Sequence, residues 1–484
     1  MTGTTQHFGK HFLKPLAAGS ILLLSACAQN SRAARSPAPP SGEVATAAYM
    51  EAIRNDPSAL ALFLREMPKG GDLHNHLSGS VYAESFIRWA IEDGLCLTAT
   101  TVSLSPPPCT VADNEIPASA LTGDATLYGQ VIDAWSVRNW NPARKSGHDQ
   151  FFESFSKFSA ADHRLGDMLA EVVSRAGRQN ISYLELMFGP DRGRAIGLAR
   201  RLGTNTDFGA MRERLLASGL RDSLIVSRRA IDSAETRERR LMNCAARTRD
   251  KGCDVTVRYL YQVLRGLDPP AVFAQILAGF EMARLDARWV GFNLVMPEDA
   301  PVPMRDFRLH MRMIDFLHDL YPEVRITLHA GELAEGMVPP EGMRFHIGES
   351  VTRGHASRIG HGTAITHEDN AEALMRDMAT RHILVEVGLS SSDVILGIKG
   401  KRHPLRTYLR YGVPIALATD DEGVARSTLT LEFRKAVIEQ GLDYRTLKQM
   451  VRNSITFSFA EDSVKSRLSR ELDAGFVRFE SRRH

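Results

Sequence analysis

The sequence predicts an α/β protein built on a (β/α)8 TIM barrel, with a helical insertion after strand 1 and extra terminal helices. Two observations predict this fold. From about residue 180, short apolar or β-branched runs alternate with amphipathic stretches, a pattern that favours parallel strands joined by helices. Polar residues also cluster where several of these runs end, and barrel sites lie at the carboxyl ends of the strands. The predicted strands are 71–77, Ile181–Phe188, Val255–Val263, Val290–Val295, Ile326–His329, Arg358–His361, Ile383–Leu389 and Ile415–Thr419.

An open, doubly wound sheet is the alternative architecture. That fold usually carries a glycine-rich phosphate-binding loop directly after its first strand, and no such loop follows residues 71–77. The eight strand–helix units in series therefore favour the barrel.

The parts of the chain outside this alternation of strands and helices are predicted from weaker patterns. Residues 43–66 carry apolar side chains at helical spacing and predict one helix. The stretch 82–177 is longer than a normal barrel connection, so we expect an insertion that is helical at both ends and proline-rich in the middle. The chain after about residue 431 is expected to be helical and to pack under the barrel.

Residues 1–26 are predicted to form a lipoprotein signal peptide. Lysines precede an apolar run too short to span a bilayer, as in secretory signals. The run ends in Leu-Ser-Ala-Cys, which resembles the lipobox of bacterial lipoproteins and implies lipidation of Cys27. A flexible tether over 27–43, rich in Ser, Ala and Pro, then leads to the barrel domain at 44–484. An ordinary cleaved signal with an incidental cysteine is the alternative.

This N-terminus predicts an exported protein of a Gram-negative-type bacterium that faces the periplasm or sits at the outer membrane. Residue 28 is alanine rather than aspartate, which favours the outer membrane under the lipoprotein sorting rule. No other stretch is long and apolar enough to cross a bilayer, so the lipid anchor is the only membrane contact that we expect.

Four cysteines besides Cys27 predict disulfide bonds, because an exported chain meets an oxidising compartment. Their spacing favours two local bridges, Cys96–Cys109 and Cys244–Cys253. The other two pairings and four unpaired thiols stay open. None of the spacings is that of a zinc finger.

The charge composition argues against nucleic acid as a partner. The chain has 60 basic and 57 acidic residues and a net charge of +3, so it carries no overall basic field.

The candidate metal ligands come from three predicted strand ends. His74 and His76 stand one residue apart, and residues i and i+2 point the same way only on a strand. His329 ends the fifth strand, and Asp420 follows the eighth. Three imidazoles and a carboxylate suit one Zn²⁺ per chain, with a coordination position left for water. Each residue alone is more simply explained as a core histidine or a turn aspartate.

Three further residues beside these ligands are candidates for proton transfer. Asp421 can accept a proton from an activated water while its neighbour binds the cation. Glu332 lies three residues past His329 and can shuttle a proton to the substrate. His361 ends the sixth strand and can orient the attacking group or stabilise developing charge.

Taken together, the four motifs resemble those of the adenosine deaminase family, and within it the secreted, growth-factor-related branch. The resemblance covers roughly residues 45–460 and is specific through the order and spacing of the motifs. It implies that the four candidate ligands hold zinc and that Glu332 protonates the purine N1. His361 and Asp421 would position the attacking hydroxide at C6. The motifs are His-x-His-x-x-Gly, His-Ala-Gly-Glu, Arg-Ile-Gly-His-Gly and Thr-Asp-Asp.

Three positions are expected to contact the substrate, and two of them depart from the family pattern. Many members have an aspartate that helps bind the ribose where this chain has Ser78. A glycine whose N–H meets the purine ring is replaced by Met296, whereas Glu298 matches the secreted branch. These departures affect the expected identity of the substrate more than the expected reaction, because the metal and proton-transfer residues match the family pattern.

The predicted function is therefore zinc-dependent hydrolytic deamination of adenosine or a related 6-aminopurine nucleoside, with a purine nucleoside as the small-molecule partner. One rival is another mononuclear amidohydrolase. A second is a surface-tethered nucleoside-binding protein without turnover, which the presence of Glu332 and of all four ligands disfavours. The insertion offers a surface for a homodimer or for a receptor, and the sequence leaves both open.

Overall fold

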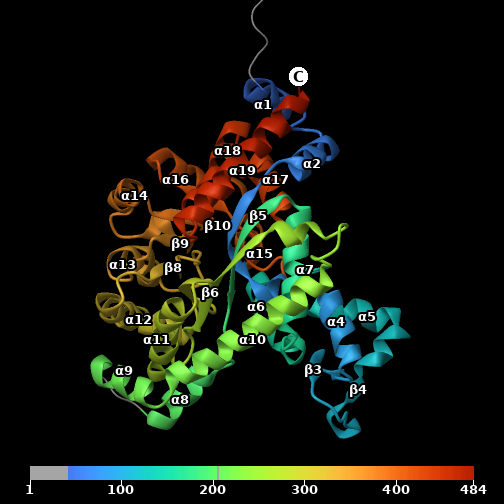
Figure 1. The fold of residues 1–484 in the computed structure, drawn as a ribbon, viewed down its shortest axis with the longest axis vertical. Helices are drawn as coiled ribbons and strands as arrows, with labels where there is room; N and C mark the ends of the chain where they lie inside the picture. The colour runs from blue at the N-terminus through green and yellow to red at the C-terminus, as the bar shows by residue number, and fades with distance from the viewer. Residues whose placement is uncertain (1–41, 204–206, 484) are drawn as a thin grey trace, which may run out of the picture. The chain divides into compact units, whose positions relative to one another are not determined.

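The computed structural model describes residues 42–203 and 207–483 and shows a (β/α)8 barrel (Figure 1). Eight parallel strands follow one another around the sheet in chain order. The last strand approaches the first through hydrogen bonds from the N–H of His76 to the carbonyl of Asp420 (3.0 Å) and from the N–H of Asp420 to the carbonyl of His74 (2.9 Å). The predicted fold class is confirmed. The strands are β1 (Gly70–His76), β5 (Ile181–Phe188), β6 (Thr256–Leu264), β7 (Trp289–Val295), β8 (Arg325–Ala330), β9 (Arg358–His361), β10 (Leu384–Val387) and β11 (Ile415–Leu417).

Helices surround the sheet because most strand residues are buried on both faces and must be covered. The alternation of strands and amphipathic stretches that the sequence predicts from about residue 180 is present as strands joined by helices. None of the described helices combines the length and the apolar character needed to cross a bilayer. The connecting helices are α11 (Pro269–Leu285), α12 (Pro301–Leu320), α13 (His346–Thr352), α14 (Ala371–Thr380), α15 (Leu389–Leu396) and α16 (Leu405–Tyr411).

The single helix predicted over 43–66 is wrong, because the chain forms two helices there, α1 (Gly42–Ala52) and α2 (Pro57–Glu66). The side chain of Asp56 accepts the N–H groups of Ser58 and Ala59, and Pro57 lacks the N–H that a continuous helix would need. The last two residues of the predicted tether lie in α1. Cys27, the signal peptide and the rest of the tether lie outside the described residues.

The insertion after β1 begins and ends with helices, as expected, but its middle holds a small antiparallel sheet that the sequence did not suggest. The strands of this sheet are three residues long, too short for a recognisable alternation of side chains. A bond between Cys96 and Cys109 joins the first of them to the proline-rich loop. The elements are α3 (Leu77–Ser80), α4 (Ala83–Glu92), β2 (Cys96–Thr98), β3 (Ser103–Ser105), β4 (Glu115–Pro117), α5 (Ala125–Ala134), α6 (Gly147–Phe158) and α7 (Leu165–Arg178).

A second excursion separates β5 from β6. It comprises α8 (Arg194–Leu202), α9 (Phe208–Ala217) and α10 (Leu220–Leu241), and a bond between Cys244 and Cys253 closes the loop that returns to the barrel. Both disulfide pairs are thus those favoured by sequence spacing.

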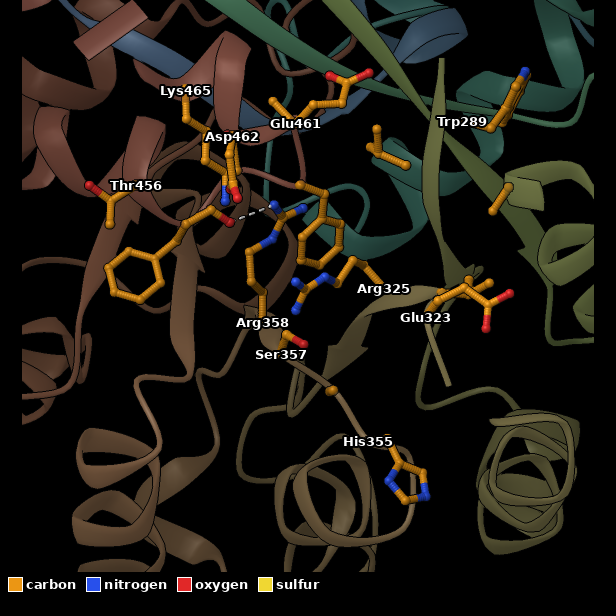
Figure 2. Close-up of a pocket in the computed structure, with 18 of the residues that line it drawn as sticks. Trp289, Glu323, Arg325, His355, Ser357, Arg358, Thr456, Glu461, Asp462 and Lys465 are labelled. Carbon is orange, nitrogen blue, oxygen red and sulfur yellow. Dashed lines mark hydrogen bonds between the residues drawn. The ribbon is translucent and has the colours of Figure 1, made fainter. Parts of the chain in front are cut away.

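Of the C-terminal helices, α18 (Tyr444–Thr456) and α19 (Asp462–Glu480) lie at the amino-terminal end of the barrel, as predicted. Helix α17 (Leu429–Ile438) instead begins near the carboxyl end, where Glu432 accepts the N–H of Leu389 just beyond β10. The hydroxyl of Ser454 on α18 accepts the N–H of Gly71 at 2.7 Å. A cavity of about 870 Å³ lies at the amino-terminal end, with Arg358 among the residues that line it (Figure 2). Arg358 donates a hydrogen bond to the carbonyl of Phe457, and its guanidinium lies 3.6 Å from the centre of the Phe459 ring. The predicted metal ligands do not line this cavity.

Candidate metal centre and active site

The four predicted ligands meet in one buried cluster, although they are spread over more than three hundred residues of sequence. Their ligand atoms all lie within 4.8 Å of one another. Nε2 of His329 is 3.0 Å from Nε2 of His74 and 3.2 Å from Nε2 of His76, and Oδ1 of Asp420 is 3.3 Å from Nε2 of His76. The cluster therefore presents three imidazole nitrogens and one carboxylate oxygen to a common point.

The protonation of two of these rings indicates that a cation fits between them. Nδ1 of His74 lies 2.7 Å from a carboxylate oxygen of Glu386, so this nitrogen carries the proton. Nδ1 of His329 likewise donates to the side-chain oxygen of Asn293 at 2.9 Å, and the backbone N–H of His329 fixes that oxygen in place. Both Nε2 atoms then turn lone pairs toward each other across 3.0 Å, and a bound cation removes this repulsion.

Glu386 and Asn293 are residues that sequence reasoning did not assign to the site. Glu386 lies on β10 and is held by Arg358 (2.6 Å) and by the hydroxyl of Thr327 (3.0 Å). Asn293 lies on β7, inside an otherwise apolar strand. Polar residues in buried strand runs were the available signal, because a buried polar group requires a partner.

The predicted proton-transfer residues surround the cluster. Oε1 of Glu332 lies 3.6 Å from Nε2 of His361, and both side chains are buried. Burial, reinforced by the negative charges of Asp420 and Glu298, raises the pKa of Glu332 well above its usual value. Glu332 can therefore hold a proton near neutral pH and give it to a bound base.

Two of these residues keep polar atoms available for a reactant. Neither ring nitrogen of His361 has a hydrogen-bond partner among the described residues, and burial lowers the pKa of this ring to about 3. Oδ1 of Asp421 also lacks a partner there. A neutral imidazole and a free carboxylate oxygen beside the ligand cluster are suited to hold and deprotonate a water.

The backbone of three strand ends at the site adopts positive φ: Met296 has φ 89°, His361 66° and Asp420 61°. Such conformations cost of order 1–3 kcal/mol for residues other than glycine and cluster at functional sites. Met296 therefore keeps a conformation that glycine would adopt without strain. Its carbonyl accepts a hydrogen bond from Nε of the buried Arg265 at 3.0 Å, which holds the strand end in place.

The structure places Glu298 differently from the predicted substrate contact. Its carboxylate is buried and accepts the N–H groups of Gly331 (3.0 Å) and Glu332 (2.8 Å). Burial alone would raise its pKa, but His346 and Arg265 hold the pKa at about 2. Glu298 therefore positions the loop that carries Glu332 rather than facing a substrate.

A cavity of about 410 Å³ opens over the ligand cluster. Ser78 and Met296, two of the positions expected to contact the substrate, line this cavity. Three phenylalanines of α6 form an apolar wall that the sequence did not suggest: Phe151, Phe152 and Phe155. The insertion therefore contributes directly to the site.

Comparison with known proteins agrees with this geometry. The model of the adenosine deaminase family matches residues 144–475. An adenosine deaminase of Shewanella woodyi is 24% identical over 411 residues, covering 82% of this chain and 96% of the relative. One of Erwinia tasmaniensis is 25% identical over 404 residues, covering 83% and 97%.

Solved structures share the fold at lower identity. The N6-methyl-AMP deaminase of Arabidopsis thaliana is 20% identical, with a TM-score of 0.56 and coverage of 86% of this chain and 98% of that one. A zinc-bound amidohydrolase of Burkholderia ambifaria is 18% identical, with a TM-score of 0.52 and coverage of 87% and 94%. With the family match over most of its length and the metal-type cluster at its strand ends, the chain belongs to the adenosine deaminase family of hydrolases.

Proposed function

We propose that the protein is a zinc-dependent enzyme that hydrolytically deaminates adenosine or a related 6-aminopurine nucleoside. The observation that carries the proposal is the cluster of His74, His76, His329 and Asp420 beneath a cavity that Glu332 also lines. Nitrogen and carboxylate ligands in this number suit Zn²⁺. The relatives named adenosine deaminase and the zinc-bound amidohydrolase of the same fold support this choice.

Asp421, His361 and Glu332 have different roles in the proposed reaction. Zinc, when bound, supplies a water that is acidic enough to react at neutral pH. Asp421 accepts a proton from this water as its oxygen adds to C6, and His361 orients the oxygen. Glu332 donates its proton to N1 of the ring, which makes C6 more electrophilic. Asp421 returns its proton to the exocyclic nitrogen, the bond from C6 to that nitrogen breaks, and ammonia leaves. The remaining hydroxyl proton passes to Glu332 as the C6 carbonyl forms, while N1 keeps the proton that it received.

Ammonia release from the zinc-loaded full chain tests the proposal. The panel is adenosine, adenine, AMP and 2′-deoxyadenosine, because the neighbours of this fold include deaminases named for a base and for a nucleotide. We expect turnover of at least one nucleoside or nucleotide together with one zinc per chain. A zinc-replete protein that is inert on the whole panel would contradict catalysis and favour the nucleoside-binding alternative.

We also propose that the protein is exported and anchored through a lipid on Cys27. The two disulfides of the structure support an oxidising compartment, because such bonds are rare in reducing cytosols. Cys27→Ser should move the protein from the membrane fraction to the soluble fraction. Continued membrane association of the variant would refute the anchor. The assignment to the secreted branch of the family stays a prediction.

A further inference from the structure

A second cavity, of about 690 Å³, shares part of its lining with the cavity over the metal cluster, and we call it the side chamber. The two cavities share Ser78, Gln262 and Leu264 in their linings. Most of the remaining lining of the side chamber comes from residues 162–168, from the loop after β5 and from α10. A substrate whose base lies over the metal cluster can therefore extend past Ser78 into this chamber.

Most charged groups on the walls of the side chamber already have partners. Arg237 donates two hydrogen bonds to Asp167, at 2.5 and 2.7 Å. Arg164 is paired with Asp93 and Glu92. These ion pairs stabilise the walls of the chamber, and the paired groups are therefore not available to a ligand.

Among the described residues that line the chamber, Arg192 is the one arginine without such a partner. Its side chain is exposed on the chamber wall, with no hydrogen bond or ion pair to another described residue. The turn that carries it is fixed, because Asp191 accepts the N–H groups of Gly193 (3.1 Å) and Ala195 (2.7 Å). Asp162, also on the wall, offsets part of the charge of Arg192.

The segment that carries Arg192 is rich in arginine, whereas the lining of the chamber itself holds three aspartates and three arginines. Residues 192–249 contain fourteen arginines and six acidic residues, a net charge of +8, whereas the whole chain carries only +3. Such a local excess of one sign attracts oppositely charged ligands. Eight arginines of the segment are exposed and make no side-chain hydrogen bond or ion pair to another described residue: Arg192, Arg194, Arg200, Arg201, Arg229, Arg239, Arg240 and Arg247.

We propose that the side chamber receives the sugar and a negatively charged 5′ substituent, so that the enzyme prefers 6-aminopurine nucleoside 5′-phosphates to free nucleosides. Arg192 contacts the phosphate, and Ser78 lies where the sugar passes between the cavities. The guanidinium is suited to this task because it meets two phosphate oxygens at once. The inference rests on the proposed deaminase function and specifies its substrate class.

The test compares kcat/KM for AMP and for adenosine with the zinc-loaded full chain. AMP should be the better substrate, and its advantage should shrink as the salt concentration rises. Arg192→Gln should lower the ratio of kcat/KM for AMP to that for adenosine by about 10- to 100-fold, the effect of one hydrogen bond to a charged group. Arg434→Gln removes an exposed arginine on α17 that has no hydrogen bond or ion pair among the residues that the structure describes, and it should leave the ratio unchanged.

Binding provides a readout that does not require turnover. IMP should bind the zinc-loaded protein more tightly than inosine in calorimetry, and Arg192→Gln should remove most of the difference. If adenosine is turned over as well as AMP and IMP binds no better than inosine, the substrate-class inference is wrong while the deaminase proposal stands. If nothing on the panel is turned over but IMP binds through Arg192, the deaminase proposal fails and the phosphate site stands.

Discussion

Replacing Glu386 by glutamine should weaken zinc binding by about 10- to 100-fold, or about 1.4–2.7 kcal/mol. The carboxylate of Glu386 lies 2.7 Å from Nδ1 of His74, and both side chains are buried. It keeps the proton on Nδ1, so that Nε2 faces the metal. A neutral amide accepts a weaker hydrogen bond than a carboxylate, and its NH2 group can turn toward the ring instead.

Glu185→Gln is the matched control, because Glu386 has a second role. Both carboxylates are hydrogen-bonded to the buried guanidinium of Arg358. Within the described part of the chain, however, Glu185 contacts none of the metal ligands and instead accepts the N–H of Phe459. Both substitutions remove one negative charge beside Arg358 and should lower stability in urea unfolding to a similar extent. Only Glu386→Gln should change the affinity for zinc.

The assay is competition for zinc between the apoprotein and a chelator of known affinity, with urea unfolding measured on the same samples. Equal zinc affinities for the two variants would refute the reasoning. Any loss of zinc affinity would then come from the charge removed beside Arg358, which both variants share, and not from the hydrogen bond to His74. An unchanged affinity in Glu386→Gln would likewise show that this carboxylate does not set the metal site.

Three other predictions address catalysis, metal binding and pH. Glu332→Gln should keep zinc but lose about 10²–10⁴-fold in kcat, because it cannot donate the proton; near-normal turnover would remove its assigned role. His76→Ala should lose zinc, and a variant with full occupancy in metal analysis would take this residue out of the ligand set. Burial raises the pKa of Glu432 to about 7, above its value near 4.3 in the unfolded chain. Its contribution to stability is therefore fully present below about pH 4.3 and is lost as the pH rises through 7. Glu432→Gln should gain up to about 3 kcal/mol over the wild type between pH 4.5 and pH 8 in urea unfolding, whereas the exposed Glu372→Gln should show no such trend.

The barrel could be predicted because each strand carries its own signal. Two strand ranges, Ile181–Phe188 and Arg358–His361, are the same in the prediction and in the structure. The metal ligands could be placed because parallel strands bring their carboxyl ends to one edge, whatever their separation in sequence. Local pattern and topology were sufficient for these features.

The parts that could not be predicted depend on contacts between distant segments. Glu298 was expected to face the substrate, but its oxygens accept the N–H groups of Gly331 and Glu332 behind the site. The phenylalanines of α6 line the cavity only because the insertion folds back over the strand ends. Neither arrangement leaves a periodicity or a spacing in the sequence, so residue types alone could not distinguish them from ordinary helix and loop residues.

Two motif glycines explain why the four motifs are informative together and weak alone. A Cβ atom on Gly360 would lie 2.6 Å from Cε1 of His74, and one on Gly79 would lie 1.5 Å from Oδ1 of Asp421. Neither glycine has a positive φ, so space and not backbone conformation excludes a larger residue there. In each case the glycine of one motif makes room for a site residue of another. The motifs therefore constrain one another across the barrel, and a chain that carries all of them in order must bring those side chains into the same small volume.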